Sequence, residues 1–225
     1  MGYGATGRIL RVDLTRMHCH TEQLDEDVYR LYPGGKALAG YFMLREFVPG
    51  TDALSPDSVL VVANGLLTGA PVSTAARFTV AARSPLTGAY GESEAGGYFG
   101  PELKAAGYEA IIVTGRAAAP VYLSIRDANV EIRDAGGLWG REPDDVQTAI
   151  RAELGDSYVR VLQIGPGGEN LVRYAALTNE LAHFNGRTGM GAVMGSKNLK
   201  AIAVRGKRPY ARLAHDPKPI AEIGK

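Results

Sequence analysis

The chain has 225 residues, enough for one large domain or two small ones, and its 45% hydrophobic and 22% charged content is typical of globular proteins. A net charge of +1, without a run of basic residues, argues against nucleic acid or a membrane surface as partner. The single cysteine, Cys19, excludes an intrachain disulfide and an all-cysteine zinc or iron–sulfur site from this chain alone. Because no secretory signal and no bilayer-length apolar run is visible, we expect a cytoplasmic protein.

The first 56 residues predict a hairpin followed by two helices. Residues 9–14 alternate apolar and polar side chains and predict a strand, which residues 19–24 could pair with. Residues 25–32 predict a short helix that begins near an aspartate and is interrupted by Pro-Gly-Gly at 33–35. Residues 36–47 have helical apolar spacing and predict a second helix.

From Ser58 onward the same order of elements occurs twice: strand, glycine turn, strand, glycine-bearing loop, short helical piece, and a strand that ends in glycine. The first copy predicts strands at 59–62, 77–82 and 110–115, a loop at 84–97 and a helix at 98–106. The second copy begins at Val159 and predicts strands at 159–164, 172–177 and 199–206, with a glycine-bearing loop at 185–195. Because the copies begin roughly a hundred residues apart, a two-fold duplication inside one domain is favoured over a solenoid.

Between the copies, residues 121–125 and 130–132 predict strands and residues 144–154 an amphipathic helix. We therefore predict an α+β fold of two β-sheets with helices outside them, a four-layer sandwich with internal pseudo-two-fold duplication. Residues 1–208 would form this domain. Residues 209–225 resemble a linker, through Asp-Pro-Lys-Pro at 216–219, and the start of a helix at 220 that belongs to a further region.

The clustering of the 29 glycines is the first indication of function. One interpretation is simply many tight turns. The other is that consecutive backbone N–H groups in each glycine-bearing loop form an anion-binding nest, strengthened where a helix begins. Two such nests around a pseudo-two-fold axis would suit a ligand with two phosphates, best a cofactor made of two identical halves.

Nucleotide-binding motifs fit less well. Gly-Met-Gly at 189–191, with Gly195, superficially resembles a dinucleotide fingerprint, but the preceding residues 181–187 do not predict the strand that this fingerprint needs. Gly-Ser-Lys at 195–197 inverts the Gly-Lys-Ser order of a P-loop. No Ser-His-Asp arrangement and no metal-ligand spacing emerges, so we expect no catalytic residue in this chain.

Four side chains near the glycines are candidates for the site. Arg77 is either a surface-strand arginine or a contact to an anionic cofactor, and Arg187, which lies between glycines, is the better candidate for phosphate. His183 is most simply a polar residue of a loop or helix end. The Glu94 carboxylate would repel phosphate, so we expect its side chain to point away with only its backbone near the ligand.

Five ordered motifs make the chain resemble the aldehyde:ferredoxin oxidoreductase family in its amino-terminal domain, from about Gly4 to Gly206. They are GRILRVDL at 7–14, SPLTG at 84–88, GGYFG at 96–100, IGPGGEN at 164–170 and GMGAVMGSKNLK at 189–200. The resemblance implies a two-sheet, helix-flanked base under a tungsten, occasionally molybdenum, bis-pterin cofactor whose two phosphates are bridged by a magnesium ion.

The resemblance also implies the site residues. Arg77 matches the arginine between cofactor and iron–sulfur cluster, and the two phosphate loops match Glu94, Ala95 and Gly96, and His183, Phe184, Gly186 and Arg187. The backbone carbonyls of Glu94 and Phe184 would meet the magnesium. Two positions depart from the family, since its archaeal aldehyde oxidisers typically have Asn at position 94 and Arg at position 183.

The family's cluster cysteines and acid/base residues lie in a carboxy-terminal region that this chain lacks, so a [4Fe-4S] cluster is expected only with that region or with a separate catalytic chain. The expected function is therefore the cofactor platform of an oxidoreductase that interconverts aldehydes and carboxylic acids, with ferredoxin as partner. The alternatives are a stand-alone pterin-cofactor binder without catalysis, or the platform of a related carbonyl or aromatic acyl-thioester reductase. Assembly into a homo-oligomer is also compatible with the sequence.

Overall fold

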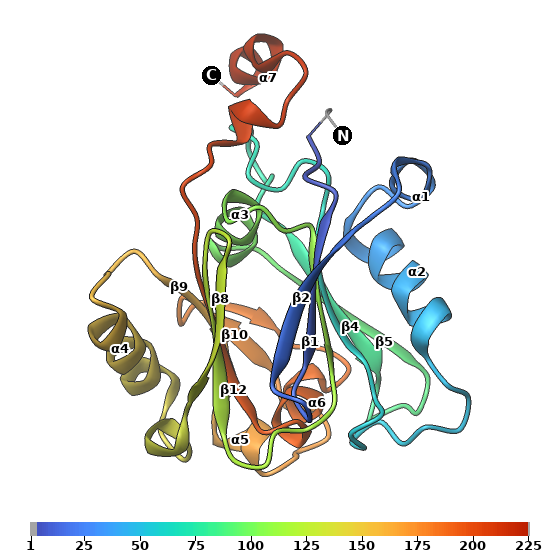
Figure 1. Cartoon of the computed structure of the whole chain (residues 1–225), viewed down its shortest axis with the longest axis vertical. Helices are drawn as coiled ribbons and strands as arrows, with labels where there is room; N and C mark the ends of the chain where they lie inside the picture. Colours follow the sequence, from blue (N-terminus) through green and yellow to red (C-terminus); the bar gives the residue numbers. More distant parts are fainter. Residues whose placement is uncertain (1–3, 225) are drawn as a thin grey trace.

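The computed structural model describes residues 4–224, which form two six-stranded mixed sheets with helices packed against them (Figure 1). The first sheet has the spatial order β2 (His18–Gln23), β1 (Arg8–Asp13), β6 (Ala110–Thr114), β3 (Leu60–Asn64), β4 (Phe78–Arg83) and β5 (Tyr90–Ala95). The second has the order β8 (Asn129–Asp134), β7 (Val121–Arg126), β12 (Leu199–Arg205), β9 (Arg160–Gln163), β10 (Leu177–Asn179) and β11 (His183–Asn185). The predicted α+β class is confirmed.

Each strand of the first sheet has a counterpart six strands later in the second. One pair in each sheet is parallel, β1 with β6 and β7 with β12, and the other pairs are antiparallel. The predicted duplication is therefore present, but the copies begin earlier than Ser58 and Val159. They begin at β1 and β7, so the elements interpreted as lying between the copies are the first part of the second copy.

The helices occupy two kinds of position. Helix α2 (Gly35–Glu46), with α1 (Glu26–Leu31), packs on the outer face of the first sheet, and α4 (Pro143–Leu154) packs on that of the second (Figure 1). Helices α3 (Phe99–Ala105) and α6 (Met190–Ser196) instead contact strands of both sheets and contribute to the core between them. The expectation that helices lie outside the sheets is therefore right for α2 and α4 and wrong for α3 and α6.

Local sequence explains the elements that were predicted well. Strands β3 and β6 are almost wholly buried, and strands covered on both faces become continuous apolar runs. Helix α4 begins with Pro143, has two aspartates in its first turn and is capped after Leu154 by Gly155, which adopts a left-handed conformation with φ 62°. The remaining short elements are η1 (Gly136–Leu138), α5 (Pro166–Glu169), η2 (Tyr210–Arg212) and α7 (Pro217–Ile223).

The strand predicted at 172–177 is wrong except for its last residue, where β10 begins. The preceding backbone is used by the start of α6 instead, because the Gly191 N–H donates to the Ala175 carbonyl at 2.9 Å. A Cβ atom at Gly191 would collide with the same backbone, 2.8 Å from the Ala175 oxygen. Glycine therefore allows α6 to begin directly against this segment, which prevents the segment from pairing as a strand.

Three other expectations need correction. The loop predicted at 84–97 contains β5, and the region 181–187, from which a strand was not expected, contains β11. Because β11 pairs antiparallel with β10 at a sheet edge, it still does not form the parallel unit of a dinucleotide fold. The helix predicted from 220 begins at Pro217, with the Asp216 carboxylate accepting from the Lys218 N–H at 3.0 Å, so part of the supposed linker is helical. Across residues 4–224, none of the helices has the length and apolar character needed to cross a membrane.

Candidate functional site

The two glycine-bearing loops predicted as phosphate sites meet where β5, an edge of the first sheet, faces β11, an edge of the second. Just after β11, the Arg187 N–H donates to the Ser93 hydroxyl at 3.2 Å. The Thr188 hydroxyl donates to the Glu92 carbonyl at 3.0 Å. These hydrogen bonds join backbone to side chain across a separation of more than ninety residues in sequence, so the duplicated fold brings equivalent loops together.

Two fully buried asparagines fix this seam. The Asn185 side-chain amide donates to the Ser93 carbonyl at 2.8 Å. The Asn179 amide donates to the Gly96 carbonyl at 3.2 Å and to the His183 carbonyl at 3.3 Å. Each asparagine comes from the β10–β11 hairpin and binds the end of β5. The relative position of the two loops is therefore set by hydrogen bonds from two buried asparagines, which are costly to break.

Gly97 closes the contact between the loops. Its φ of +87° lies in the region that side chains rarely adopt, and a Cβ atom there would lie 2.6 Å from Cδ2 of His183 and would also collide with the Asn179 amide oxygen. The His183 ring therefore packs directly against the glycine backbone. No larger residue would allow this close approach.

A hollow of about 470 Å³ opens beside the seam. It is lined by Lys36, Glu92, Ser93, Glu94, Phe184, Gly186 and Arg187. Four of the eight predicted site residues, Glu94, Phe184, Gly186 and Arg187, thus share one hollow. Sequence reasoning missed Lys36, Glu92 and Ser93, and the only local signal for Lys36 is that it directly follows the Gly34–Gly35 pair at the start of α2.

The hollow carries two positive and two negative side chains. The Lys36 ammonium lies 3.1 Å from the Glu92 carboxylate and 3.5 Å from that of Glu94. The hydrogen bond to Glu92 and the charges of both carboxylates raise the pKa of Lys36 above its usual value, so it is protonated at neutral pH. The Glu94 side chain was expected to point away. It is instead paired with Lys36, which lines the hollow.

The other four predicted residues lie around the hollow rather than in it. Ala95 is the last residue of β5, and Gly96 follows it with its carbonyl bound to Asn179. His183, the first residue of β11, is half-buried against Gly97. Arg77 is exposed and directly precedes β4. Its neighbour Phe78 pairs with Ala95, so the backbone of Arg77 lies at the end of the first sheet where β5 leads into the first phosphate loop.

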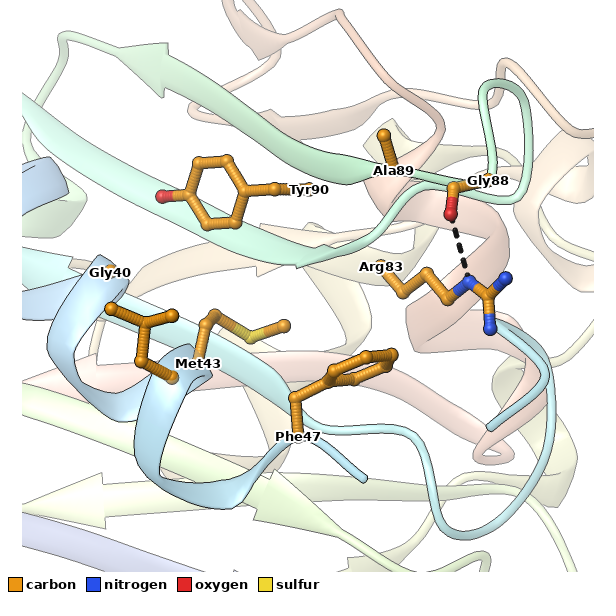
Figure 2. Close-up of a pocket in the computed structure, with 8 residues that line it drawn as sticks. Gly40, Met43, Phe47, Arg83, Gly88, Ala89 and Tyr90 are labelled. Atoms are coloured by element: carbon orange, nitrogen blue, oxygen red, sulfur yellow. Dashed lines mark hydrogen bonds between the residues drawn. The ribbon is translucent and has the colours of Figure 1, made fainter. Parts of the chain in front are cut away.

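A second hollow, of about 440 Å³, lies between α2 and the β4–β5 hairpin (Figure 2). Its walls are Gly40, Met43, Leu44, Phe47, Arg83, Gly88, Ala89 and Tyr90. The one cation there, Arg83, is directed to the backbone, with its Nε donating to the Gly88 carbonyl at 3.0 Å. None of the predicted site residues lines this hollow, so the candidate site is the one at the seam.

Residues 9–206 match the sequence profile of the family described as "Aldehyde ferredoxin oxidoreductase, N-terminal domain". Among solved structures, the chain is similar to the active site complex BamBC of benzoyl coenzyme A reductase, with a TM-score of 0.90 and 38% identity over 92% of this chain and 32% of that one. The fold and the sequence thus define the amino-terminal domain of an oxidoreductase family.

The chain is 47% identical to the tungsten-containing aldehyde ferredoxin oxidoreductase of Pyrococcus furiosus, over 92% of its own length and 34% of the relative's. The aliphatic sulfonate oxidoreductase WOR-like subunit of the same organism is 36% identical, with 92% and 35% covered. The chain therefore belongs to the aldehyde ferredoxin oxidoreductase family. It spans about one third of the length of these relatives.

Proposed function

We propose that this chain is the cofactor-binding platform of a tungsten-dependent oxidoreductase that interconverts aldehydes and carboxylic acids, with ferredoxin as electron acceptor. The observation that carries the proposal is the meeting of two equivalent glycine-bearing loops at one hollow, in a chain 47% identical to a tungsten-containing aldehyde ferredoxin oxidoreductase. Within residues 4–224 there is no group of three or more His, Cys, Asp or Glu placed to hold a metal. The proposal assigns the iron–sulfur cluster and the acid/base groups to a further region or to a partner chain.

The residues at the seam fit an anionic, phosphate-bearing group with a magnesium ion. The hollow offers the carboxylates of Glu92 and Glu94 beside the cations Lys36 and Arg187. Carboxylate and carbonyl oxygens are the ligands that magnesium prefers, and Arg187 is a suitable phosphate contact. When bound, the tungsten or molybdenum bis-pterin group would supply the redox chemistry.

The chain's own residues would bind and orient that group. Arg187 and the backbone around Gly186 would hold one phosphate, with the backbone from Glu94 to Gly96 at the other. The carbonyls of Glu94 and Phe184 would face the magnesium, and Arg77 would lie on the side toward the cluster. His183, packed on Gly97, would join the two loops rather than offer the cationic contact of an arginine. Residues 1–208 would form this platform, and 209–225 would lead to the next region.

A second candidate is the platform of an aromatic acyl-thioester reductase. It is favoured by the similarity to the benzoyl coenzyme A reductase complex, a structure with bound 1,5-dienoyl-CoA. The two candidates share the platform and differ in the substrate pocket. Steady-state assays of the complete native protein with an aldehyde and with benzoyl coenzyme A would separate them.

The test of the platform is the composition of the native polypeptide that contains these residues. We expect a mass well above the 23.9 kDa of this chain, together with tungsten by elemental mass spectrometry and two pterins per polypeptide by fluorescence after oxidation. A heavier polypeptide without tungsten, molybdenum or pterin would overturn the proposal. A native species of 23.9 kDa that contains pterin would instead support the stand-alone binder.

A further inference from the structure

Lys36 enters the hollow from an element remote from both phosphate loops. It is the second residue of α2, directly after Gly34 and Gly35, whose φ values of +85° and +54° allow the sharp entry into the helix. The isolated bridge between Gly34 and Gly65 ties this entry to the end of β3. The backbone therefore fixes the point from which the Lys36 side chain reaches the carboxylates of β5.

The ammonium of Lys36 is paired with two carboxylates but remains accessible to solvent. Its side chain is 60% exposed, and both partners, Glu92 and Glu94, lie on the same face of β5. Ion pairs this exposed contribute little to stability, so exchanging their partners costs little. Fixing one lysine between two carboxylates beside an open hollow is therefore poorly explained by stability alone.

The four charged side chains that line the hollow have a net charge of zero when they are taken together. Arg187 and Lys36 contribute two positive charges, and Glu92 and Glu94 two negative ones. A phosphate alone would be attracted by the cations and repelled by the carboxylates. A phosphate that arrives with a divalent cation would satisfy both, because the cation can face the carboxylates while the lysine turns to the phosphate oxygens.

We propose that Lys36 is a phosphate-binding residue of this hollow. When the ligand binds, the Lys36 ammonium leaves the carboxylates of Glu92 and Glu94 and contacts a phosphate of the ligand on the side opposite to these carboxylates. Arg187 contributes to the same phosphate contact. This inference rests on the proposed function, because it assumes that the hollow takes a phosphate-bearing ligand. It adds a contact from α2 to the two loops that the sequence indicated. It also gives the two carboxylates the role of holding the lysine in place before the ligand arrives.

The test is the affinity of the complete native polypeptide, prepared without cofactor, for inorganic pyrophosphate with equimolar magnesium, measured by isothermal titration calorimetry. Lys36→Met should weaken binding by about tenfold or more, since it removes a charge-assisted hydrogen bond. Lys36→Arg should stay within about threefold of the wild type, because the charge is kept. Glu92→Gln should strengthen pyrophosphate binding without magnesium, because it removes one competing carboxylate.

Lys207→Met is the matched control, because Lys207 is an exposed lysine that does not line the hollow. Thermal unfolding of each variant checks that the fold is retained. Equal affinities of the wild type, Lys36→Met and Lys207→Met would overturn the inference and leave the proposed function standing. Equal losses for Lys36→Met and Lys36→Arg would also overturn it, since the charge would then be irrelevant. A wild-type chain that does not bind pyrophosphate would overturn both proposals.

Discussion

The side-chain amide of Asn179 donates a hydrogen bond to the backbone carbonyl of Gly96 at 3.2 Å, and so joins the second sheet to the first. The same nitrogen lies 3.3 Å from the carbonyl of His183. One buried amide thus connects the ends of both candidate phosphate loops. Its own oxygen has no hydrogen-bond partner among the described residues, so Asn179 holds the seam through its donor group alone.

Asn179→Ala should reduce the free energy of unfolding by about 1–3 kcal/mol, because it removes a fully buried amide and leaves the part-buried Gly96 carbonyl without this donor. Urea denaturation measures this loss. The same variant should bind magnesium pyrophosphate more weakly, since the two loops are no longer held in register. Asn129→Ala is the control. Asn129 is an exposed donor to Glu131 on β8, and its loss should change stability by less than about 0.5 kcal/mol. Equal effects of the two variants would contradict the structural role of Asn179.

Gly97→Ala should destabilise the chain more than Gly140→Ala does. Both glycines have positive φ values, +87° and +83°, so both substitutions carry a backbone cost of about 1–2 kcal/mol. Only at Gly97 does the added Cβ atom meet neighbours, Asn179 and His183, whereas Gly140 has open space. Overpacking should add about 1–3 kcal/mol at Gly97. If the two variants have the same denaturation midpoint, the residues around Gly97 adjust to the added Cβ atom without a further cost, which contradicts this prediction.

The strands that sequence alone could predict are those whose buried positions hold large apolar side chains, such as β3 and β6. Strand β5 was missed because its buried positions are Gly91, Ser93 and Ala95, which give no hydrophobic pattern. Gly91 must be small, since a Cβ there would lie 2.9 Å from Ser84 and 3.0 Å from Met190. Close packing between the sheets, which is a tertiary effect, decided this element.

The candidate site could be predicted as two glycine-bearing loops that share one ligand, but the side chains that bring the loops together could not be predicted. The meeting of the loops depends on the Asn179 and Asn185 side chains, whose partners lie 83 and 92 residues away. Lys36 could not be assigned, because only the packing of α2 against β3 and β4 brings it to the hollow. The start of the duplication was misjudged because β1 and β7 occupy equivalent positions in the two sheets but have no glycine pattern in common.

Lys200→Met should cost about 3–5 kcal/mol of stability. The ammonium of Lys200 is fully buried and binds the Arg141 carbonyl at 3.0 Å and the Glu169 carboxylate, which is 4% exposed. Removing the lysine leaves that carboxylate buried without a cation. The double variant Lys200→Met, Glu169→Leu should recover more than half of the loss, because no uncompensated charge remains. Urea denaturation compares the two. A double variant as unstable as the single one would show that packing around α5, rather than charge, is responsible.

Lys197 should make stability rise with pH above neutrality. Its ammonium is fully buried and donates to the carbonyls of Pro56, at 3.4 Å, Ser58, and Gly115, at 3.2 Å, without a carboxylate partner. Burial, and the positive charge of Arg116, lower the pKa of Lys197 to about 8 from the usual 10.5. Between these values the unfolded chain binds more protons than the folded one, so the folded state gains stability as pH increases.

The measurement is the difference in unfolding free energy between the wild type and Lys197→Met at several pH values from 7 to 9.5. Other titrating groups contribute to both proteins and cancel in the difference. From pH 8 upward, the unfolding free energy of the wild type should increase relative to that of the variant, by about 1.4 kcal/mol per pH unit at most. Below pH 7.5 the difference between the two unfolding free energies should be constant. A difference that is flat through pH 9.5 would mean that the three carbonyls keep the ammonium charged despite its burial.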